Sequence, residues 1–417
     1  MRVRIGIDET DSSRGGCTTY IAYRIALEEN IVSPPRLVRL NPNVPRKTRG
    51  NGALALEIET DDPDSLRERV IEIVAELRDP KEDTGVVMVK EENKRLLYQR
   101  YLKALHEVVS DPPVHLAEKY YYRNSGRGLI GALAAIGFEG VYTYELLTYR
   151  LQENIGKPRR IDEESVRRFE LSTKKTFGNV SPHPIIAPHG RDPVLYGIRG
   201  TDPKELLEGL RIIRSEPFEG YALFVTNQAT DAHLIPRKID ELRPYVPAYI
   251  EGRVKAKGKI GQHVYVEVED DTGSIEAFFY RQKGFLRRIA ELLELLEPGD
   301  YIGLLGGVRP PSDERDMTLN VEKLRIYRLV DRVRYLNPRC PRCGKRLKSA
   351  GKGKGRKCPR CGWRGYLPKE KVVEKPKITT GVFVGIPDSR RHLLKPPRVK
   401  PVFDEHRKSI DRKPRRL

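Results

Sequence analysis

The first 235 residues alternate between short hydrophobic strands and amphipathic helices, as in α/β proteins. Val3, Ile5 and Ile7 predict an opening strand, and a helix is expected from about Thr19 to Glu29. Two βαβ units are expected further on, as residues 53–58, 64–78 and 85–89, and as residues 194–198, 203–213 and 221–225. Because these units are far apart in the sequence, they suggest a ferredoxin-like unit interrupted by, or intertwined with, another α/β domain.

The stretch from 247 to 330 shows the two-residue alternation of an all-β domain. The alternation starts at Tyr249 and again at His263, and the Asp-Asp-Thr-Gly sequence at 270–273 predicts a hairpin turn. A strand over 274–280, a helix over 285–296 and a strand over 299–304 should follow. This is the order of an OB-fold, a barrel that often binds oligonucleotides. The alternative is a small barrel with another ligand.

The positive charge of the chain is concentrated near its C-terminus. The chain has 78 Lys and Arg against 58 Asp and Glu, a net charge of +20. Residues 1–336 hold 52 of each sign, whereas residues 337–376 hold 14 basic and 2 acidic residues, and residues 377–417 hold 12 and 4. Clustered Lys and Arg beside a neutral body favour nucleic-acid binding, because neutralised phosphates release counterions. The alternative is a solvated basic tail with no specific partner.

The hydropathy of the chain argues against the membrane and secreted classes. The mean hydropathy is −0.57, and the longest apolar run, residues 128–137, is far shorter than the ~18 residues of a membrane span. The first residues run straight into the opening strand and lack the apolar core of a signal peptide. We therefore expect a cytoplasmic protein.

Four of the five cysteines form two CPRCG motifs. They are Cys340, Cys343, Cys358 and Cys361. Each CxxC turn directs two thiolates at one tetrahedral ion, and in a cytoplasmic protein metal binding is preferred over disulfides. The four sulfurs predict a structural Zn²⁺ site with no open position for catalysis. Basic residues surround the motifs, with Trp363 and Tyr366 among them, a composition suited to single-stranded RNA or DNA.

An acidic, glycine-rich loop follows the first strand and opens the first helix. Asp8, Glu9 and Asp11 could hold Mg²⁺, and residues 12–16 offer backbone N–H groups for phosphate oxygens. The spacing differs from that of a Walker A loop. Thr18 would lie near a bound phosphate. The alternatives are acidic residues that only cap the helix and a Thr18 that serves only as its cap.

A second loop, residues 41–52, places basic side chains and an Asn among glycines just before a strand. Lys47 and Arg49 can neutralise phosphate charge, and glycines let the backbone approach a ligand closely. The alternative is a surface hairpin turn. The Gly-Arg-Gly loop at 126–128 is weaker evidence of the same kind, and residues 227–233 are too polar for a plain connection but suggest no role.

Together these motifs resemble the archaeal 2-agmatinylcytidine synthetases of the minor isoleucine tRNA over essentially the whole chain. The matching segments are GIDETDS and GGCTTY near the start, NPNVPRKTRGNGA, GRGLIGALAAIG, APHGRDPVLYGIRG, TNQATDAHL, the OB region and the CPRCG pair. The resemblance implies a multidomain α/β plus all-β protein, in which a kinase-like α/β domain is intertwined with a ferredoxin-like domain. The implied domains are a kinase-like domain at 1–59 and 125–193, a ferredoxin-like domain at 60–124 and 194–235, an OB-fold at 245–330, a zinc ribbon at 335–370 and a basic tail at 371–417.

The resemblance also implies roles for individual residues. Asp8 and Asp11 match the family's acidic metal and catalytic cluster, and Thr18 matches the threonine that is itself phosphorylated. Glu9 stands where Asp is more usual, so its carboxylate has a longer side chain. The residues expected to contact ATP are Glu9, Ser12, Arg14, Gly15, Gly16, Lys47, Arg49, Gly50, Asn51, Gly52 and Arg127. Agmatine, the implied co-substrate, is a dication, so its pocket should carry acidic groups.

The implied reaction uses ATP to phosphorylate carbon 2 of the wobble cytidine in a CAU-anticodon isoleucine tRNA. The amine of agmatine then displaces the phosphate, so that the tRNA reads AUA rather than AUG. An unactivated carbonyl carbon has no good leaving group, and Mg²⁺ with Lys and Arg stabilises the charge that develops. The base must first be flipped out of the anticodon loop.

Two alternatives come from other function classes. A non-enzymatic single-stranded nucleic-acid-binding protein would use the OB-fold and the ribbon, but it leaves the acidic loop and about 235 α/β residues unexplained. The other alternative is a different ATP-using nucleic-acid enzyme, such as a ligase, although no lysine nucleophile motif stands out.

Overall fold

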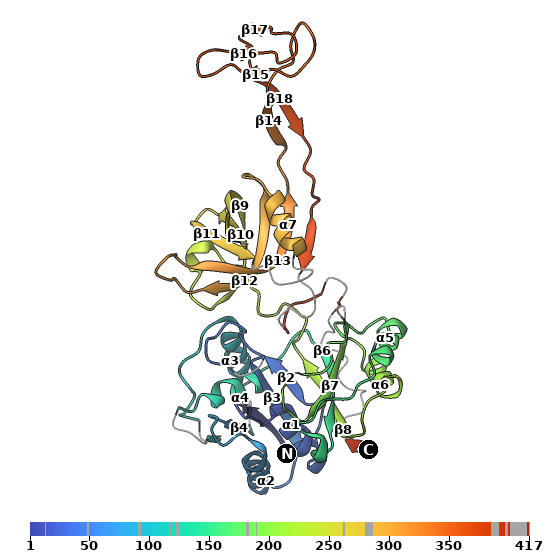
Figure 1. The fold of residues 1–417 in the computed structure, drawn as a ribbon. Helices are drawn as coiled ribbons and strands as arrows, with labels where there is room; N and C mark the ends of the chain where they lie inside the picture. The colour runs from blue at the N-terminus through green and yellow to red at the C-terminus, as the bar shows by residue number, and fades with distance from the viewer. Residues whose placement is uncertain are drawn as a thin grey trace.

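The computed structural model describes residues 1–417 except 13, 48–49, 91–92, 117, 122–124, 181–182, 189, 262, 280–286, 385–391, 397–398, 401–414 and 417. Three parts follow one another in space: an α/β body, a β-barrel and a small ribbon at the far end (Figure 1). Both chain termini lie on the body (Figure 1). No helix in the described part of the chain is long and apolar enough to span a membrane.

The first half of the body is a βαββαβ arrangement. Its elements are β1 (Arg2–Asp8), α1 (Thr18–Glu28), β2 (Arg36–Arg39), β3 (Gly52–Glu59), α2 (Pro63–Leu77) and β4 (Gly85–Val89). β1 pairs antiparallel with both β3 and β4, so it lies between the two strands of the predicted βαβ unit. The order β4-β1-β3-β2 is that of a ferredoxin-like unit, and residues 2–89 complete it without later strands.

The second half of the body repeats this split arrangement on the same sheet. β6 (Thr143–Arg150) lies between β7 (Val194–Gly200) and β8 (Phe218–Thr226) and is antiparallel to both. α6 (Pro203–Ile212) connects β7 to β8, as the sequence predicts. The two halves meet where β2 and β8 pair in parallel, Arg36 with Val225 and Leu37 with Thr226. This short seam makes one continuous sheet, which β5 (Lys119–Tyr121) extends beside β4.

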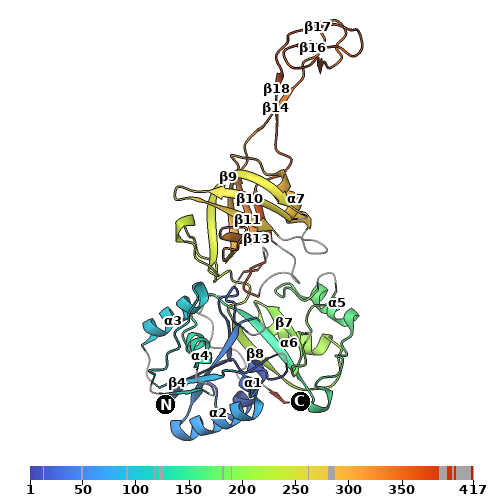
Figure 2. The ribbon, with the colours of Figure 1, turned by 60° about the vertical axis from the view of Figure 1, so that its left-hand side comes forward.

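Helices cover both faces of the sheet (Figures 1 and 2). Val3, Ile5 and Ile7 point toward α1 and α2 and share one buried cluster with them. The opposite face is covered by α3 (Lys94–His106), α4 (Gly128–Ile136), α5 (Glu163–Ser172) and α6. Gly6 faces α4, and a Cβ there would lie 2.0 Å from the Ala132 carbonyl oxygen, so the glycine allows the helix to pack closely.

The barrel has the OB-fold order that the alternation predicts. Its elements are β9 (Pro247–Ile260), β10 (His263–Glu269), β11 (Ser274–Phe279), α7 (Arg287–Leu295), β12 (Tyr301–Arg309) and β13 (Thr318–Arg328). A parallel pairing of β11 with β13 closes the barrel. Position 280 of the predicted strand and positions 285–286 of the predicted helix lie outside the described residues.

A two-stranded neck carries the ribbon away from the barrel (Figure 2). The neck pairs β14 (Arg332–Leu336) with β18 (Glu370–Glu374), and the ribbon contains β15 (Lys348–Ser349), β16 (Arg356–Lys357) and β17 (Arg364–Gly365). After the neck, β19 (Gly381–Val384) pairs with β13 of the barrel, and β20 (Arg415–Arg416) pairs with β8 of the body. The chain therefore forms the ribbon between β14 and β18 and then contributes one more strand to the barrel and one to the body.

Candidate active site

The acidic loop begins where β1 ends. Asp8 and Glu9 are 8% and 7% exposed, and the Glu9 N–H donates to Asp8 Oδ1 over 2.8 Å. Glu9 has a left-handed backbone conformation, with φ of +56°, and its carbonyl accepts from the Thr84 hydroxyl over 2.7 Å. α4 passes next to Asp8, because a Cβ at Gly131 would lie 1.8 Å from Asp8 Oδ2. Neighbouring elements thus hold the buried carboxylate of Asp8 in place.

Thr18 is the first residue of α1 and is 5% exposed. The Thr10 hydroxyl donates to Thr18 Oγ1 over 2.8 Å, and Thr18 Oγ1 donates to Asp11 Oδ1 over 3.2 Å. The N-cap of α1 is Cys17, and its side chain makes no capping hydrogen bond. The Thr18 hydroxyl is therefore engaged by two side chains of the acidic loop, those of Thr10 and Asp11.

The carboxylates of this loop outnumber the cations beside them. Burial raises the pKa of Asp8 well above its usual value, and the charges of Glu9 and Asp11 raise it further. Burial also raises the pKa of Glu9, although Arg127, whose Nη2 lies 3.3 Å from Glu9 Oε2, opposes this shift. Such a cluster fits a bound cation, which would stabilise the ionised carboxylates.

Ser12 and Arg14 are held by the segment after α2. The Ser12 hydroxyl donates to Asp79 Oδ2, and Arg14 Nη2 lies 3.0 Å from the same oxygen and 3.3 Å from Glu82 Oε1. The Ser12 hydrogen bond is the main cause of an Asp79 pKa near 2. The Ser12 N–H donates to the Gly15 carbonyl over 2.8 Å, which turns the loop.

A pocket of about 470 Å³ opens beside the N-terminus of α1. Its walls come from α1, β2, β3, β6, β7 and the loop before β7. Of the predicted site residues it brings together Asp11, Gly16, Thr18 and Gly52. The pocket is also lined by charged and imidazole side chains that the sequence did not indicate. These are Arg39, Glu145, Asp192, Arg199 and His392.

Glu145 is the centre of a buried charge cluster in this pocket. Burial would raise the pKa of Glu145, but Arg199, Arg39 and Gln228 more than offset that effect and lower it. Arg199 Nε lies 2.9 Å from Glu145 Oε1, and the Gln228 amide donates to Oε2. Asn227 accepts from the Arg39 N–H and donates to its carbonyl, both over 2.8 Å. The polar stretch at 227–233 thus fixes the charged wall of the pocket, a role that its sequence did not indicate.

The second predicted loop packs against Arg39. A Cβ at Gly50 or Gly52 would lie 2.6 or 2.7 Å from Arg39 Nη1, so both glycines make room for the guanidinium. Asn51 has φ of +44° and donates to the Asn41 carbonyl over 2.8 Å. Lys47 is exposed, and position 49, where Arg49 was predicted to contact phosphate, lies outside the described residues.

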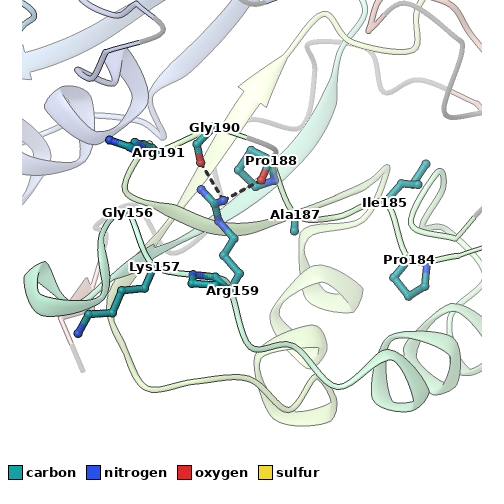
Figure 3. A pocket seen from close by; sticks show the side chains of 10 residues that line it. Gly156, Lys157, Arg159, Pro184, Ile185, Ala187, Pro188, Gly190 and Arg191 are labelled. Carbon is teal, nitrogen blue, oxygen red and sulfur yellow. Dashed lines mark hydrogen bonds between the residues drawn. The ribbon is translucent and has the colours of Figure 1, made fainter.

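The loop before β7 lines both this pocket and a second hollow, which also has a volume of about 470 Å³. Figure 3 shows this hollow, with Arg159 reaching the loop from below. The Arg159 guanidinium donates to the carbonyls of Pro188, Gly190, Asp192 and Val194 and to the Asp192 carboxylate, over 2.8 to 3.1 Å. One side chain therefore fixes the loop that carries Asp192 into the pocket.

The four predicted zinc ligands converge at the tip of the ribbon. The sulfurs of Cys340, Cys343, Cys358 and Cys361 lie within 4.8 Å of one another. Gly344 and Gly362 have φ of +71° and +74°, the left-handed conformation expected after each CxxC turn. Burial opposes ionisation of Cys358, but the N–H groups of Cys361 and Arg360 lower its pKa to about 6. Four thiols in this arrangement fit one tetrahedral Zn²⁺.

Known proteins match the chain along its length. Residues 4–62, 126–233 and 337–376 match the models of the TiaS TCKD domain, the TiaS FLD domain and the TiaS C-terminal zinc ribbon domain, and residues 248–327 match an OB-fold nucleic acid binding domain. The isoleucine tRNA 2-agmatinylcytidine synthetase TiaS of Pyrococcus horikoshii is 40% identical over 422 residues, covering 95% of this chain and 97% of its own. The predicted division at residue 193 falls inside the 126–233 match and stays a prediction.

Two solved structures resemble the whole molecule. The complex of TiaS with its isoleucine tRNA and ATP has a TM-score of 0.84 at 35% identity, covering 95% of this chain and 97% of that one. The complex of TiaS with the same tRNA, AMPCPP and agmatine has a TM-score of 0.79 at 33% identity, covering 95% and 96%. The similarity thus extends over body, barrel and ribbon together.

Proposed function

Because this chain belongs to the isoleucine tRNA 2-agmatinylcytidine synthetase family, we propose that it attaches agmatine to the wobble cytidine of a CAU-anticodon isoleucine tRNA, using ATP. The observation that carries this function is 40% identity over 95% of the chain to the synthetase of Pyrococcus horikoshii. Solved relatives hold tRNA with ATP, and tRNA with an ATP analogue and agmatine. The chain is thus an ATP-dependent tRNA-modifying ligase.

The reaction needs an activated carbon 2. Phosphorylation of the cytosine oxygen gives that carbon a leaving group, and the primary amine of agmatine then forms the new C–N bond as phosphate departs. In phosphoryl transfer, catalysis comes mainly from positioning and from stabilising charge on the transferred group. The pocket beside α1 supplies both, because it combines Thr18 and Asp11 with the guanidiniums of Arg39 and Arg199.

Thr18 is the candidate phosphate acceptor within the protein. Thr10 donates to the Thr18 oxygen, so the Thr18 proton is directed to Asp11 Oδ1 at 3.2 Å. Asp11 can therefore accept that proton as the hydroxyl attacks a phosphoryl group, the arrangement expected of a nucleophile and its general base. This geometry supports catalytic roles for Thr18 and Asp11.

The N-terminus of α1 supports ATP binding at the same place. Cys17 and Thr18 line the pocket, and the side chain of the N-cap residue Cys17 makes no capping hydrogen bond. The first amide groups of a helix and the helix dipole attract phosphate. Gly16 has φ of +76°, and a Cβ there would lie 2.2 Å from the Thr10 carbonyl oxygen, so the tight entry into the helix requires glycine. Contacts of ATP with Glu9, Ser12, Arg14, Gly15 and the other predicted residues remain part of this proposal.

Asp8 and Asp11 are the residues that would hold Mg²⁺. Mg²⁺ is usually bound through one or two carboxylates together with substrate phosphates, which these two side chains could provide. The raised pKa of Asp8 supports a cation there, because burial and its acidic neighbours otherwise disfavour the ionised form. The ion would neutralise part of the negative charge on the phosphates of the substrate.

The barrel and the ribbon suit the binding of tRNA away from the reaction. The segment between the neck strands, residues 337–369, contains twelve Lys and Arg and no Asp or Glu. Tyr366 in this segment is 78% exposed, as a base-stacking side chain should be. Zn²⁺ bound by the four thiolates has a structural role, because they leave no open coordination position.

A direct assay tests the function. Purified protein is incubated with ATP, agmatine and a CAU-anticodon isoleucine tRNA, and the nucleosides are analysed by mass. We expect 2-agmatinylcytidine only when all three substrates are present, and none from a control tRNA with uridine at the wobble position. Binding of the tRNA without any change in nucleoside mass would favour the alternative, a non-enzymatic nucleic-acid-binding protein.

A further inference from the structure

A segment that follows the ribbon in sequence docks onto the body. The Ala229 N–H donates to the His392 carbonyl and the Asp231 N–H to the Leu393 carbonyl, each over 2.9 Å. The Lys395 N–H donates to Asp231 Oδ1 over 2.7 Å. Ala229 and Asp231 have φ of +54° and +62°, so the loop after β8 adopts an unfavourable conformation where it binds this segment. We call residues 392–396 the return segment.

Two leucines fix the return segment in the body. Leu393 and Leu394 are 1% and 3% exposed. Leu393 belongs to the same buried cluster as Val38 of β2 and Tyr101 of α3. Burial of two leucines is a strong driving force for docking. The two leucines therefore hold the neighbouring His392 against the body.

His392 lies in the wall of the reaction pocket. It lines the same cavity as Thr18, Glu145 and Arg199. A Cβ at Gly50 would lie 3.1 Å from Cδ2 and Nε2 of the ring, so the glycine at that position gives the imidazole its space. Within the part of the chain that the structure describes, the buried Nδ1 has no hydrogen-bond partner. A buried polar atom without a partner is costly unless a ligand satisfies it.

The surroundings of the ring favour its neutral form. Burial lowers the pKa of His392 well below its usual value, and the guanidiniums of Arg39 and Arg199 lower it further. A neutral imidazole that carries its proton on Nε2 has a lone pair on Nδ1. That atom can accept a hydrogen bond from an N–H group and adds no positive charge to the pocket.

We propose that the return segment completes the reaction pocket and that Nδ1 of His392 accepts a hydrogen bond from an N–H group of the substrate. This inference rests on the proposed function, because the substrates are those of the tRNA modification. The guanidinium and amine of agmatine carry such N–H groups, and so does the exocyclic amine of a flipped cytidine. The pocket is thus assembled from the body together with residues that lie beyond the tRNA-binding ribbon in sequence.

Steady-state kinetics of the full-length protein test the role of His392. For His392→Ala we expect a roughly tenfold higher KM for the substrate that donates to Nδ1, the size of one lost hydrogen bond of about 1.4 kcal/mol. Varying agmatine in one series and tRNA in another identifies that substrate. His392→Asn should restore most of the affinity, because Asn Oδ1 can take the place of Nδ1 as acceptor. His115→Ala, at an exposed histidine, is the matched control and should behave as wild type.

Two results would overturn the inference. One is a His392→Ala protein with unchanged KM for both agmatine and tRNA. The other is a loss that His392→Asn does not repair and that is accompanied by a lower thermal midpoint, which would mean that the segment only supports the fold. If wild-type protein binds agmatine and tRNA but makes no product, the proposed function fails. Calorimetric affinities of the variants for agmatine and for tRNA then still decide the role of His392.

Discussion

Replacement of Gly131 by alanine tests whether α4 holds Asp8 in the position proposed for Mg²⁺ binding. Helix propensity alone predicts that Gly131→Ala stabilises α4 by up to about 1 kcal/mol. In the structure, however, the new Cβ would lie 1.8 Å from Asp8 Oδ2, whereas real Cβ atoms do not approach closer than 3.0 Å. The carboxylate must therefore move by at least about 1.2 Å, or α4 must shift away from β1.

A displacement of this size should lower the rate of catalysis more than the stability of the fold. A misplacement of about 1 Å at a reacting centre can cost ~100-fold in rate. We therefore expect Gly131→Ala to lower the kcat of tRNA modification about 100-fold while the protein still binds tRNA and keeps its zinc. The assay is steady-state formation of 2-agmatinylcytidine with saturating tRNA, ATP and agmatine.

Gly209→Ala provides the matched control for this prediction. Gly209 is also a buried helical glycine, but the nearest atom to its Cβ, at 2.4 Å, is Ile198 Cδ1, the end of a flexible side chain. This variant should keep its kcat. A Gly131→Ala protein with normal kcat would refute the reasoning, because it would show that Asp8 does not need the position that α4 now enforces.

Three further predictions concern the acceptor, the zinc and the ribbon. Wild-type protein incubated with ATP should gain one phosphate on the peptide that contains Thr18, and Thr18→Ala should lose both this label and tRNA modification while keeping its zinc; intact-mass spectrometry measures the label, and an active, unlabelled variant would contradict the acceptor role. Cys340→Ser or Cys361→Ser should release zinc, measured by atomic absorption, and should impair tRNA modification more than ATP turnover without tRNA; equal losses would mean that the ribbon supports the whole fold. Replacing residues 337–369 by a short turn joins the paired neck strands and removes twelve positive charges. This change should weaken tRNA binding and make the affinity less dependent on salt concentration. An unchanged salt dependence would exclude this segment as the phosphate contact.

The sequence predicted those parts of the molecule whose signals are local. The alternation of Val3, Ile5 and Ile7 is seen in β1, and the doubled CPRCG motif brings four sulfurs together. The barrel was also predictable, since hairpin-connected strands follow one another in space as they do in sequence. In each of these cases the period of the hydrophobic residues or the spacing of the cysteines was sufficient to predict the structure.

Pairings between distant segments could not be predicted in the same way. Glu145 meets Arg39 and Arg199 because β2, β6 and β7 converge at the pocket, and no local pattern encodes that convergence. Ser12 and Arg14 were predicted to contact ATP, and the structure also places both against Asp79, 67 residues from Ser12. The return segment lies in a basic C-terminal stretch whose sequence indicated nucleic-acid binding or a solvated tail, and no contact with the body.

The seam between β2 and β8 has a consequence for the energetics of the body. Only two residue pairs join the strands there, and the pocket takes walls from both sides, with Arg39 and Gly52 on one and Glu145 and Arg199 on the other. A substrate bound in this pocket contacts both halves of the sheet, so its binding free energy also opposes their separation. At 100 times its Kd such a ligand stabilises the joined state by about 2.7 kcal/mol. The Val225 amide hydrogen, which bonds to the Pro35 carbonyl across the seam, should then exchange with solvent more slowly in the loaded enzyme than in the empty one.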